Sequence, residues 1–159
     1  DESPAIEYIR HALEMLENET RRFDIVVILQ PSSPFRSAKD IDATIRLLQD
    51  NPEADSAVSV VKLDHMVHPF KLKTLKGSEL VPFLTEEHGR FAANDLPPVY
   101  VRNGAVYVTW RRDLESRTDV IGQKSLAYIM SAARSVDINE MTDFEFAAYL
   151  YEKRQETSE

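Results

Sequence analysis

Apolar residues near the start of the chain recur at the spacing of an α-helix. Ser3 is a suitable N-cap and Pro4 a suitable first residue of such a helix, because proline is well tolerated at that position. The apolar face consists of Ile6, Ile9, Leu13 and Leu16. The pattern therefore predicts a first helix that packs against a sheet.

A continuous apolar run at residues 25–29 comes next. Its length and β-branched content predict a strand that is buried on both faces. Ser37 and Asp40 resemble a capping box, so a second helix is expected to begin there. The apolar face of this helix consists of Ile41, Ile45 and Leu48. A further apolar run at residues 56–61 predicts a second buried strand, so residues 25–61 predict one strand, helix, strand unit with a right-handed crossover.

Residues 62–98 lack the periodic pattern of a core element and are too long for an idle loop. We expect them to project from the main sheet. Strand character returns at residues 104–110 and again at residues 125–130. A final helix is expected to begin at Thr142, where Glu145 would complete a capping box. The face that this helix is expected to bury consists of Phe144, Ala147, Ala148 and Tyr151.

The order of these elements is typical of an α/β domain with a mostly parallel sheet. The chain has 159 residues, of which 43% are apolar, enough for one such domain over residues 1–159. No apolar run approaches the roughly 20 residues that span a bilayer, and the N-terminus lacks the features of a secretion signal. We therefore expect a cytoplasmic protein without a membrane partner.

Composition excludes several kinds of site. The chain has no cysteine, which excludes disulfides, thiolate nucleophiles and thiolate metal sites. A net charge of −8 argues against a nucleic-acid-binding surface, so an anionic substrate would need a local basic pocket. The four glycines lie too far apart to build a glycine-rich phosphate loop.

The turn after the first strand is a candidate binding loop. Ligands of open α/β sheets bind beyond the carboxyl ends of the strands, and two prolines restrict the backbone at this point. The side chains that the loop would present to a polar or anionic ligand include those of Gln30, Ser33 and Arg36. The alternative is an ordinary strand-to-helix connection that is rich in turn residues.

Four segments occur in an order that resembles the acylneuraminate cytidylyltransferases, the CMP-sialic acid synthetases. They are LQPSSPFRSAKDID, HPFK, DLPPVYVRNGAVYV and YIMSAARSVDINEMTDFEFA. The resemblance covers essentially the whole chain and implies a Rossmann-like sheet of the nucleotide-diphospho-sugar transferase type. Family members begin upstream with a first strand and a basic phosphate-binding loop, so this chain is expected to correspond to the C-terminal two-thirds and to be inactive alone.

The resemblance also implies a reaction and roles for particular residues. The anomeric hydroxyl of a nine-carbon sugar acid attacks the α-phosphorus of CTP, which gives a CMP-sugar and pyrophosphate. Gln30 and Asn103 match substrate-binding residues, and Lys71 matches a lysine that reaches the sugar of the neighbouring subunit in a homodimer. Residues 62–98 would form the dimerisation excursion. Asn103 with Gly104 is also a common hairpin signal, and Lys71 could be an ordinary surface residue.

The resemblance implies that the segment SVDIN holds Mg²⁺, because it matches the family's DID motif, in which two carboxylates at i and i+2 of an extended segment point the same way. Asp137 retains the family carboxylate, whereas Asn139 replaces the second one and contributes no charge, so metal binding could be weakened. Both residues are the expected catalytic and metal-binding pair. The alternative is that they order the turn before the last helix.

A second departure lies where the family has an arginine that helps to bind the sugar acid. Here Ala92 and Ala93 occupy that segment and Arg90 is the nearby cation, which could substitute through a shifted loop. The sugar could therefore differ from N-acetylneuraminate. Two other hypotheses stay open: a non-catalytic relative that serves as a binding or assembly module, and a related enzyme such as a Kdo-type cytidylyltransferase or a guanylyltransferase.

Overall fold

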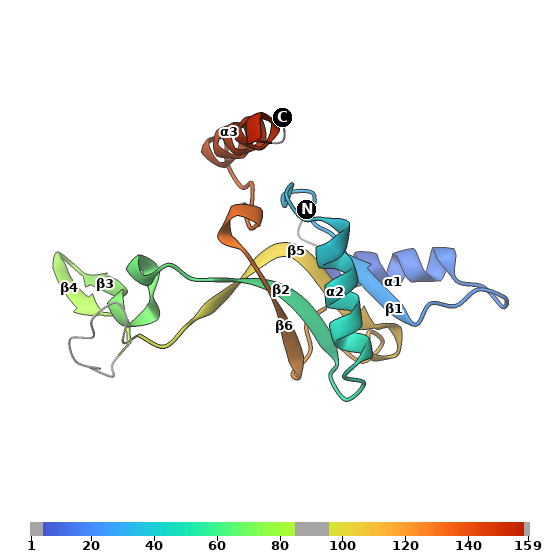
Figure 1. Cartoon of the computed structure of the whole chain (residues 1–159). Coiled ribbons are helices and arrows are strands. Elements are labelled where there is room, and N and C mark those ends of the chain that lie inside the picture. Colours follow the sequence, from blue (N-terminus) through green and yellow to red (C-terminus); the bar gives the residue numbers. More distant parts are fainter. Residues whose placement is uncertain (1–4, 85–95, 158–159) are drawn as a thin grey trace.

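A four-stranded mixed sheet with helices on both faces forms the centre of the described chain (Figure 1). The computed structural model describes residues 5–84 and 96–157. The helices are α1 (Ala5–Leu16), α2 (Ala38–Gln49) and α3 (Met141–Thr157), and short 3₁₀ turns include η1 (His65–Val67), η2 (Pro69–Lys71), η4 (Arg111–Asp113) and η5 (Ala132–Arg134). The strands are β1 (Ile25–Ile28), β2 (Ser56–Lys62), β3 (Lys73–Lys76), β4 (Glu79–Pro82), β5 (Tyr100–Trp110) and β6 (Ser125–Met130).

The order of the strands in the sheet is β1-β5-β2-β6. β5 is antiparallel to both β1 and β2, while β6 is parallel to β2, so three of the four strands run in one direction. This confirms the predicted fold class of an α/β domain with a mostly parallel sheet. Residues 25–61 form the predicted strand, helix, strand unit with β1 and β2 parallel, but β5 lies between these two strands, which the sequence did not predict.

Two apolar clusters fill the space between the sheet and its helices. On one face Leu48 of α2 packs with Val106 and Val108 of β5. On the other face Ile6, Ile9 and Leu13 of α1 pack with Val26 and Ile28 of β1. The predicted face of the first helix is confirmed except for Leu16, which is exposed. The expected cap at Ser3 and Pro4 lies outside the described residues.

β1 is shorter and less buried than its apolar sequence predicts. It ends at Ile28, all four residues are half-buried, and Leu29 is exposed. Within the described chain β1 is hydrogen-bonded to β5 alone, so its other edge is unpaired. The prediction of a strand buried on both faces was therefore wrong for this edge strand.

α2 begins at the predicted capping box. The Ser37 hydroxyl accepts from the Asp40 backbone, while the Asp40 side chain accepts from the Ser37 backbone at 2.8 Å. The fully buried Asp40 carboxylate also forms an ion pair with Arg134 and accepts a hydrogen bond from the hydroxyl of Tyr128 at 3.1 Å. Asp40 thus links α2 to β6 and to the segment that follows it.

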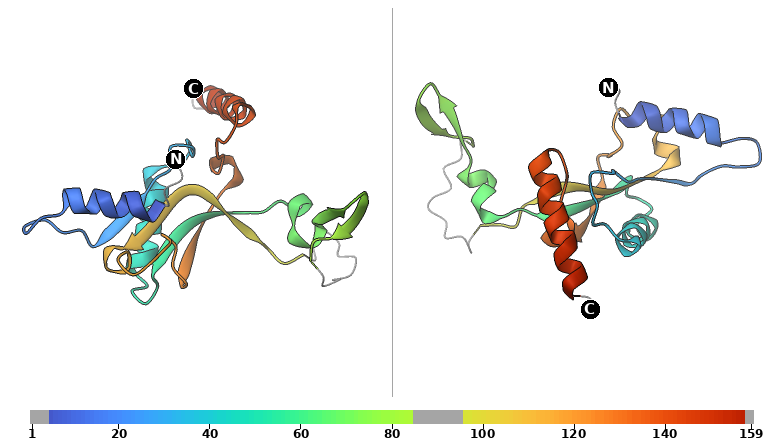
Figure 2. Two further views of the ribbon diagram at one scale, coloured as in Figure 1. Left: turned by 180° about the vertical axis from the view of Figure 1, so that it is seen from behind. Right: turned by 90° about the horizontal axis from the view of Figure 1, so that it is seen from above.

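Residues 62–84 extend away from the sheet, as Figures 1 and 2 show. β3 and β4 pair as an antiparallel hairpin around Gly77, whose φ of +65° suits glycine. The exposed side chains of this hairpin include Leu75, Leu80 and Phe83. The sequence pattern did not reveal this hairpin within the predicted excursion.

α3 stands apart from the sheet in Figure 1 and in the left view of Figure 2. The Asp143 carboxylate accepts hydrogen bonds from the backbone N–H groups of Asn139 and Glu140, at 2.9 and 3.0 Å. Asp143 therefore takes the capping role that the sequence assigned to Thr142 and Glu145. Of the four residues predicted to face inward, Ala147 is buried, whereas Phe144, Ala148 and Tyr151 are exposed.

Candidate functional site

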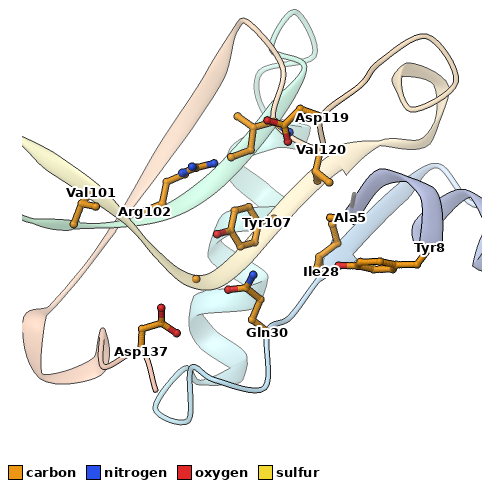
Figure 3. A pocket seen from close by; sticks show the side chains of 12 residues that line it. Ala5, Tyr8, Ile28, Gln30, Val101, Arg102, Tyr107, Asp119, Val120 and Asp137 are labelled. Atoms are coloured by element: carbon orange, nitrogen blue, oxygen red, sulfur yellow. The ribbon is translucent and has the colours of Figure 1, made fainter. Parts of the chain in front are cut away.

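A cavity of about 410 Å³ opens where β1 ends, on the face of the sheet that α1 covers (Figure 3). Its volume lies in the range typical of small-molecule sites. It combines an apolar wall with a few polar and charged groups. The lining residues are Ala5, Tyr8, Ile28, Gln30, Val101, Arg102, Gly104, Tyr107, Asp119, Val120, Ile121 and Asp137.

Gln30 enters this cavity directly after β1, as the sequence predicted for a binding loop. Its side chain is exposed, and its amide forms no hydrogen bond with other described residues. A Cβ atom on Gly104 would lie 2.6 Å from the Gln30 Oε1 and 3.6 Å from the Asp137 Oδ1. Glycine therefore leaves the space that allows these two side chains to approach the strand from either side.

β5 is irregular at this point. Tyr107 pairs with Val58, and Arg102 pairs with Val60. Five residue steps on β5 therefore lie opposite two residue steps on β2. The bulge thus contains three additional residues, and Gly104 within it has a φ of +73°. Because an odd number is inserted, Arg102 and Tyr107 both face the cavity, although their separation would place them on opposite faces of a regular strand.

Asn103 holds the bulge in place. Its side chain is 4% exposed, and its Oδ1 accepts a hydrogen bond from the Ser59 hydroxyl at 2.6 Å. Its Nδ2 donates to the Ser135 hydroxyl at 2.8 Å. Asn103 does not line the cavity, so its predicted substrate contact stays a prediction. The alternative of a hairpin at Asn103 and Gly104 was wrong, since β5 continues through both residues.

Asp137 and Asn139 lie together after η5, as their spacing predicted. The Nδ2 of Asn139 donates to the Oδ2 of Asp137 at 3.1 Å. The Oδ1 of Asp137 is buried and has no hydrogen-bond partner among the described residues. A buried carboxylate oxygen without a donor is suited to a cation.

Asp137 and Asn139 fit Mg²⁺ better than a metal that needs three or more protein ligands. Within residues 5–84 and 96–157, no group of three or more His, Cys, Asp and Glu side chains could enclose a metal ion. Mg²⁺ is commonly held by one or two protein oxygens, with water and substrate phosphates completing its shell. The Oδ1 of Asp137 and the amide oxygen of Asn139 are the groups that could supply these contacts.

Tyr107 presents a neutral hydroxyl to the cavity. Burial raises the pKa of this half-buried phenol, and the nearby carboxylates of Asp137 and Asp119 act in the same direction. The positive charge of Arg102 opposes them without reversing the shift. At neutral pH the hydroxyl is therefore protonated and can donate a hydrogen bond to a ligand.

Two residues predicted to bind substrate, Ser33 and Arg36, hold the loop in this structure, and their substrate contacts stay predictions. The guanidinium of Arg36 donates to the backbone carbonyls of Gln30 and Ala105, at 2.5 and 3.2 Å. The buried Ser33 hydroxyl donates to the Asn103 carbonyl at 3.2 Å. Neither side chain lines the cavity. The loop is therefore fixed against β5 by its own side chains, which keeps Gln30 at the rim.

Lys71 adds no cation to this cavity of its own chain. Lys71 belongs to η2, beside the projecting hairpin and remote from the cavity of its own chain. Arg90, together with Ala92 and Ala93, lies outside the described residues. The predicted roles of Lys71 and Arg90 stay predictions.

Sequence reasoning missed four polar residues of the cavity. They are Tyr8, Arg102, Tyr107 and Asp119. Arg102 and Tyr107 flank the Asn-Gly pair, and this pair was the available signal, since it is compatible with a bulge as well as with a hairpin. Tyr8 and Asp119 carry no local pattern that distinguishes them from surface residues.

Comparisons with known proteins bear on the family and the fold. No family model matches the chain. The chain is 27% identical over 157 residues to an N-acylneuraminate cytidylyltransferase of Escherichia coli, across 97% of this chain and 35% of that protein. It thus spans about a third of the length of this curated relative. The match confirms the predicted resemblance to the acylneuraminate cytidylyltransferases.

A solved structure supports the fold class. The chain superposes on a CMP:2-keto-3-deoxy-manno-octonic acid synthetase in complex with CTP, with a TM-score of 0.65 and 12% identity. The superposition covers 97% of this chain and 70% of the other. At this identity the similarity shows the fold alone. Within the described residues, no helix has both the length and the apolar character needed to cross a membrane.

Proposed function

We propose that this chain is part of a cytidylyltransferase that joins a nine-carbon sugar acid to CMP, with CTP as donor and pyrophosphate as second product. The observation that carries the proposal is the placement of Gln30 and Asp137 on either side of Gly104, in one cavity. The match to an N-acylneuraminate cytidylyltransferase supports the choice of CTP and of a sugar acid.

In this reaction a bond forms between the anomeric oxygen of the sugar and the α-phosphorus. The bond from that phosphorus to the pyrophosphate oxygen breaks, and the hydroxyl proton passes to solvent water. Catalysis of such a transfer depends mainly on positioning and on neutralising charge on phosphate oxygens. Mg²⁺, when bound, would supply that neutralisation.

The residues of the cavity have separate tasks in this proposal. Asp137 and Asn139 would hold the metal, which would neutralise charge on the phosphate oxygens. Gln30 forms hydrogen bonds with sugar hydroxyls, and Tyr107 donates a further one. Ile28 belongs to the apolar wall that keeps water away from the reacting groups.

The test is release of pyrophosphate by the full-length protein, supplied with CTP, Mg²⁺ and a panel of nine-carbon sugar acids. We expect turnover with one of these acids and at least a hundredfold lower rate for Asp137→Ala and Gln30→Ala. Asp42→Ala and Gln49→Ala are the matched controls, because both positions are exposed on α2 and lie outside the cavity. A folded wild-type protein that is inactive with every acid would contradict the proposal.

We also propose that the enzyme is a homodimer in which Lys71 contacts the sugar in the cavity of the neighbouring subunit. The projecting hairpin supports this arrangement, since its exposed Leu75, Leu80 and Phe83 are suited to burial between subunits. Mixing inactive Lys71→Ala with inactive Asp137→Ala should restore part of the activity, because a mixed dimer has one cavity with both groups. No recovery from mixed dimers would count against a role in the neighbouring subunit.

A non-catalytic relative is the second candidate, and Asn139 favours it. The amide of Asn139 donates to Asp137 and so satisfies one oxygen of the expected metal ligand within the chain. Calorimetry with CTP and Mg²⁺ separates the two candidates. Ligand binding by a protein that never releases pyrophosphate would favour the binding module.

A further inference from the structure

Arg102 is a cation to which the reaction proposed above assigns no role. It is the one lysine or arginine among the described residues that line the cavity. Its side chain is exposed, and its guanidinium forms no ion pair or hydrogen bond with other described residues. Figure 3 shows it extending from β5 into the same space as Tyr107. The group is therefore free to bind a ligand.

The position of Arg102 is built into the strand. Its β2 partner is Val60, while that of Tyr107 is Val58, and alternate residues of a strand share a face. The bulge between them is fixed by the positive φ of Gly104 and by the buried amide of Asn103. Arg102 thus reaches the cavity because of the bulge, and a regular strand would direct it to the α2 side.

The charges of the described cavity residues favour such a cation. Asp119 and Asp137 also line the cavity, so without Arg102 its described lining would carry two negative charges and no positive one, and would repel an acidic sugar. Arg36 cannot compensate, because its guanidinium is engaged by backbone carbonyls. Lys71 lies outside the cavity of its own chain.

The location favours a carboxylate over a phosphate as the anion that Arg102 binds. In Figure 3 the guanidinium is directed toward Asp119 and Val120, away from Asp137, where the metal and the phosphates are expected. Apolar residues lie in the same part of the cavity, as suits the carbon skeleton of a sugar acid. A guanidinium can bind both oxygens of a carboxylate at once, which also fixes the orientation of the acid.

We propose that Arg102 binds the carboxylate of the sugar acid and so selects acidic over neutral sugars. This inference rests on the proposed function. The carboxylate is bonded to the anomeric carbon of such acids, so its binding by Arg102 would also set the position of the attacking hydroxyl relative to Asp137. Arg102 is in this sense a specificity and positioning residue.

The test is steady-state kinetics of the full-length Arg102→Gln variant. We expect KM for the sugar acid to rise about 10- to 100-fold, as for the loss of a charge-assisted hydrogen-bonded pair, with KM for CTP unchanged. Arg102→Lys should lie between this variant and the wild type, because lysine keeps the charge without the two-point contact. The control Arg112→Gln, at an exposed arginine outside this cavity, should behave as wild type.

A neutral analogue, in which the carboxylate is replaced by a carboxamide, identifies the interacting group. Wild type and Arg102→Gln should bind this analogue equally weakly. A rise in KM for CTP alone would overturn the inference in favour of a phosphate contact, and unchanged constants for both substrates would also overturn it.

Calorimetric titration separates this inference from the proposed function. If the wild-type protein binds the acid but releases no pyrophosphate, a loss of binding in Arg102→Gln supports the inference while the proposed reaction fails. If the wild-type protein binds no acid, both are overturned.

Discussion

The hydroxyl of Ser59 on β2 donates a hydrogen bond of 2.6 Å to the Oδ1 of Asn103 on β5. The same oxygen of Ser59 accepts from the Val106 backbone N–H at 2.8 Å. Ser59 and Asn103 are both buried. One hydroxyl thus binds both ends of the bulge that directs Arg102 and Tyr107 into the cavity.

Replacement of Ser59 by alanine should therefore destabilise the protein by about 1–3 kcal/mol, because Asn103 and Val106 would each lose a buried partner. Urea unfolding followed by circular dichroism measures this change. Ser125→Ala is the matched control, since the Ser125 hydroxyl is buried but has no partner in the described chain, and its removal should be neutral or slightly stabilising. Equal losses for both variants would show that the hydrogen bonds of Ser59 are unimportant.

Gly104→Ala should reduce activity more than tenfold, whereas Gly77→Ala should leave it unchanged. Both glycines have a positive φ, so alanine at either position should destabilise by about 1–2 kcal/mol. At Gly104 the added carbon would also lie 2.6 Å from Gln30, while at Gly77 nothing lies within 4 Å. Parallel unfolding and rate measurements separate the two effects. Similar activity in the two variants would contradict the assigned place of Gly104 between Gln30 and Asp137.

Asn139→Asp should lower the Mg²⁺ concentration for half-maximal rate by about tenfold, because a second carboxylate adds charge to the proposed site. Without metal the new carboxylate would repel Asp137, so Tm should fall slightly and then rise with Mg²⁺ more than in the wild type. Asn51→Asp adds the same charge at the end of α2 and serves as the control. An unchanged Mg²⁺ response of both rate and Tm would argue against metal binding at Asp137.

Asp40 should make the free energy of unfolding depend on pH in the acidic range. Burial alone would raise the pKa of its carboxyl, but hydrogen bonds from Ser37 and the charge of Arg134 outweigh this effect, so its pKa lies below the ordinary 3.8. A lowered pKa in the folded state means that the unfolded chain binds more protons there. The stabilisation is therefore complete above about pH 5 and is lost as the pH falls through and below the ordinary value.

The variant Asp40→Asn isolates this contribution from those of other carboxylates. Its free energy of unfolding should be lower than that of the wild type by about 3–5 kcal/mol near pH 7, since it leaves Arg134 without its buried partner. The difference should narrow as the pH falls below 4. A difference that stays constant from pH 7 to pH 3 would be incompatible with the lowered pKa.

Local sequence patterns correctly predicted those features that depend only on residues close together in the chain. The capping box of Ser37 and Asp40 needs only four residues, and residues 125–130 form β6 with the predicted limits. The arrangement of the sheet is different, since an apolar run shows that a strand forms but does not show which strand it pairs with. The antiparallel insertion of β5 was therefore not predictable from residues 25–61.

Part of the candidate site was predictable from the sequence, namely the residues that follow a predicted strand. Gln30 and Asp137 follow predicted strands and lie in the cavity as expected. Arg102 was missed because, in a regular strand, a separation of five residues would place Arg102 and Tyr107 on opposite faces of the sheet. The bulge between them brings both side chains to the same face. The prediction that α3 buries Phe144 and Tyr151 was wrong. A periodic pattern identifies the apolar face of a helix, but it does not show that another element covers that face.

The pairing of Arg102 with Val60 has a consequence for how this stretch can change in length. Deletion of one or two residues between Asn103 and Val106 would shorten the bulge, but Arg102 would still face the cavity as long as it pairs with Val60. A change that shifted this pairing by one residue would turn Arg102 toward the apolar α2 side. Functional variants of this chain should therefore change in length here only where the pairing of Arg102 with Val60 is preserved.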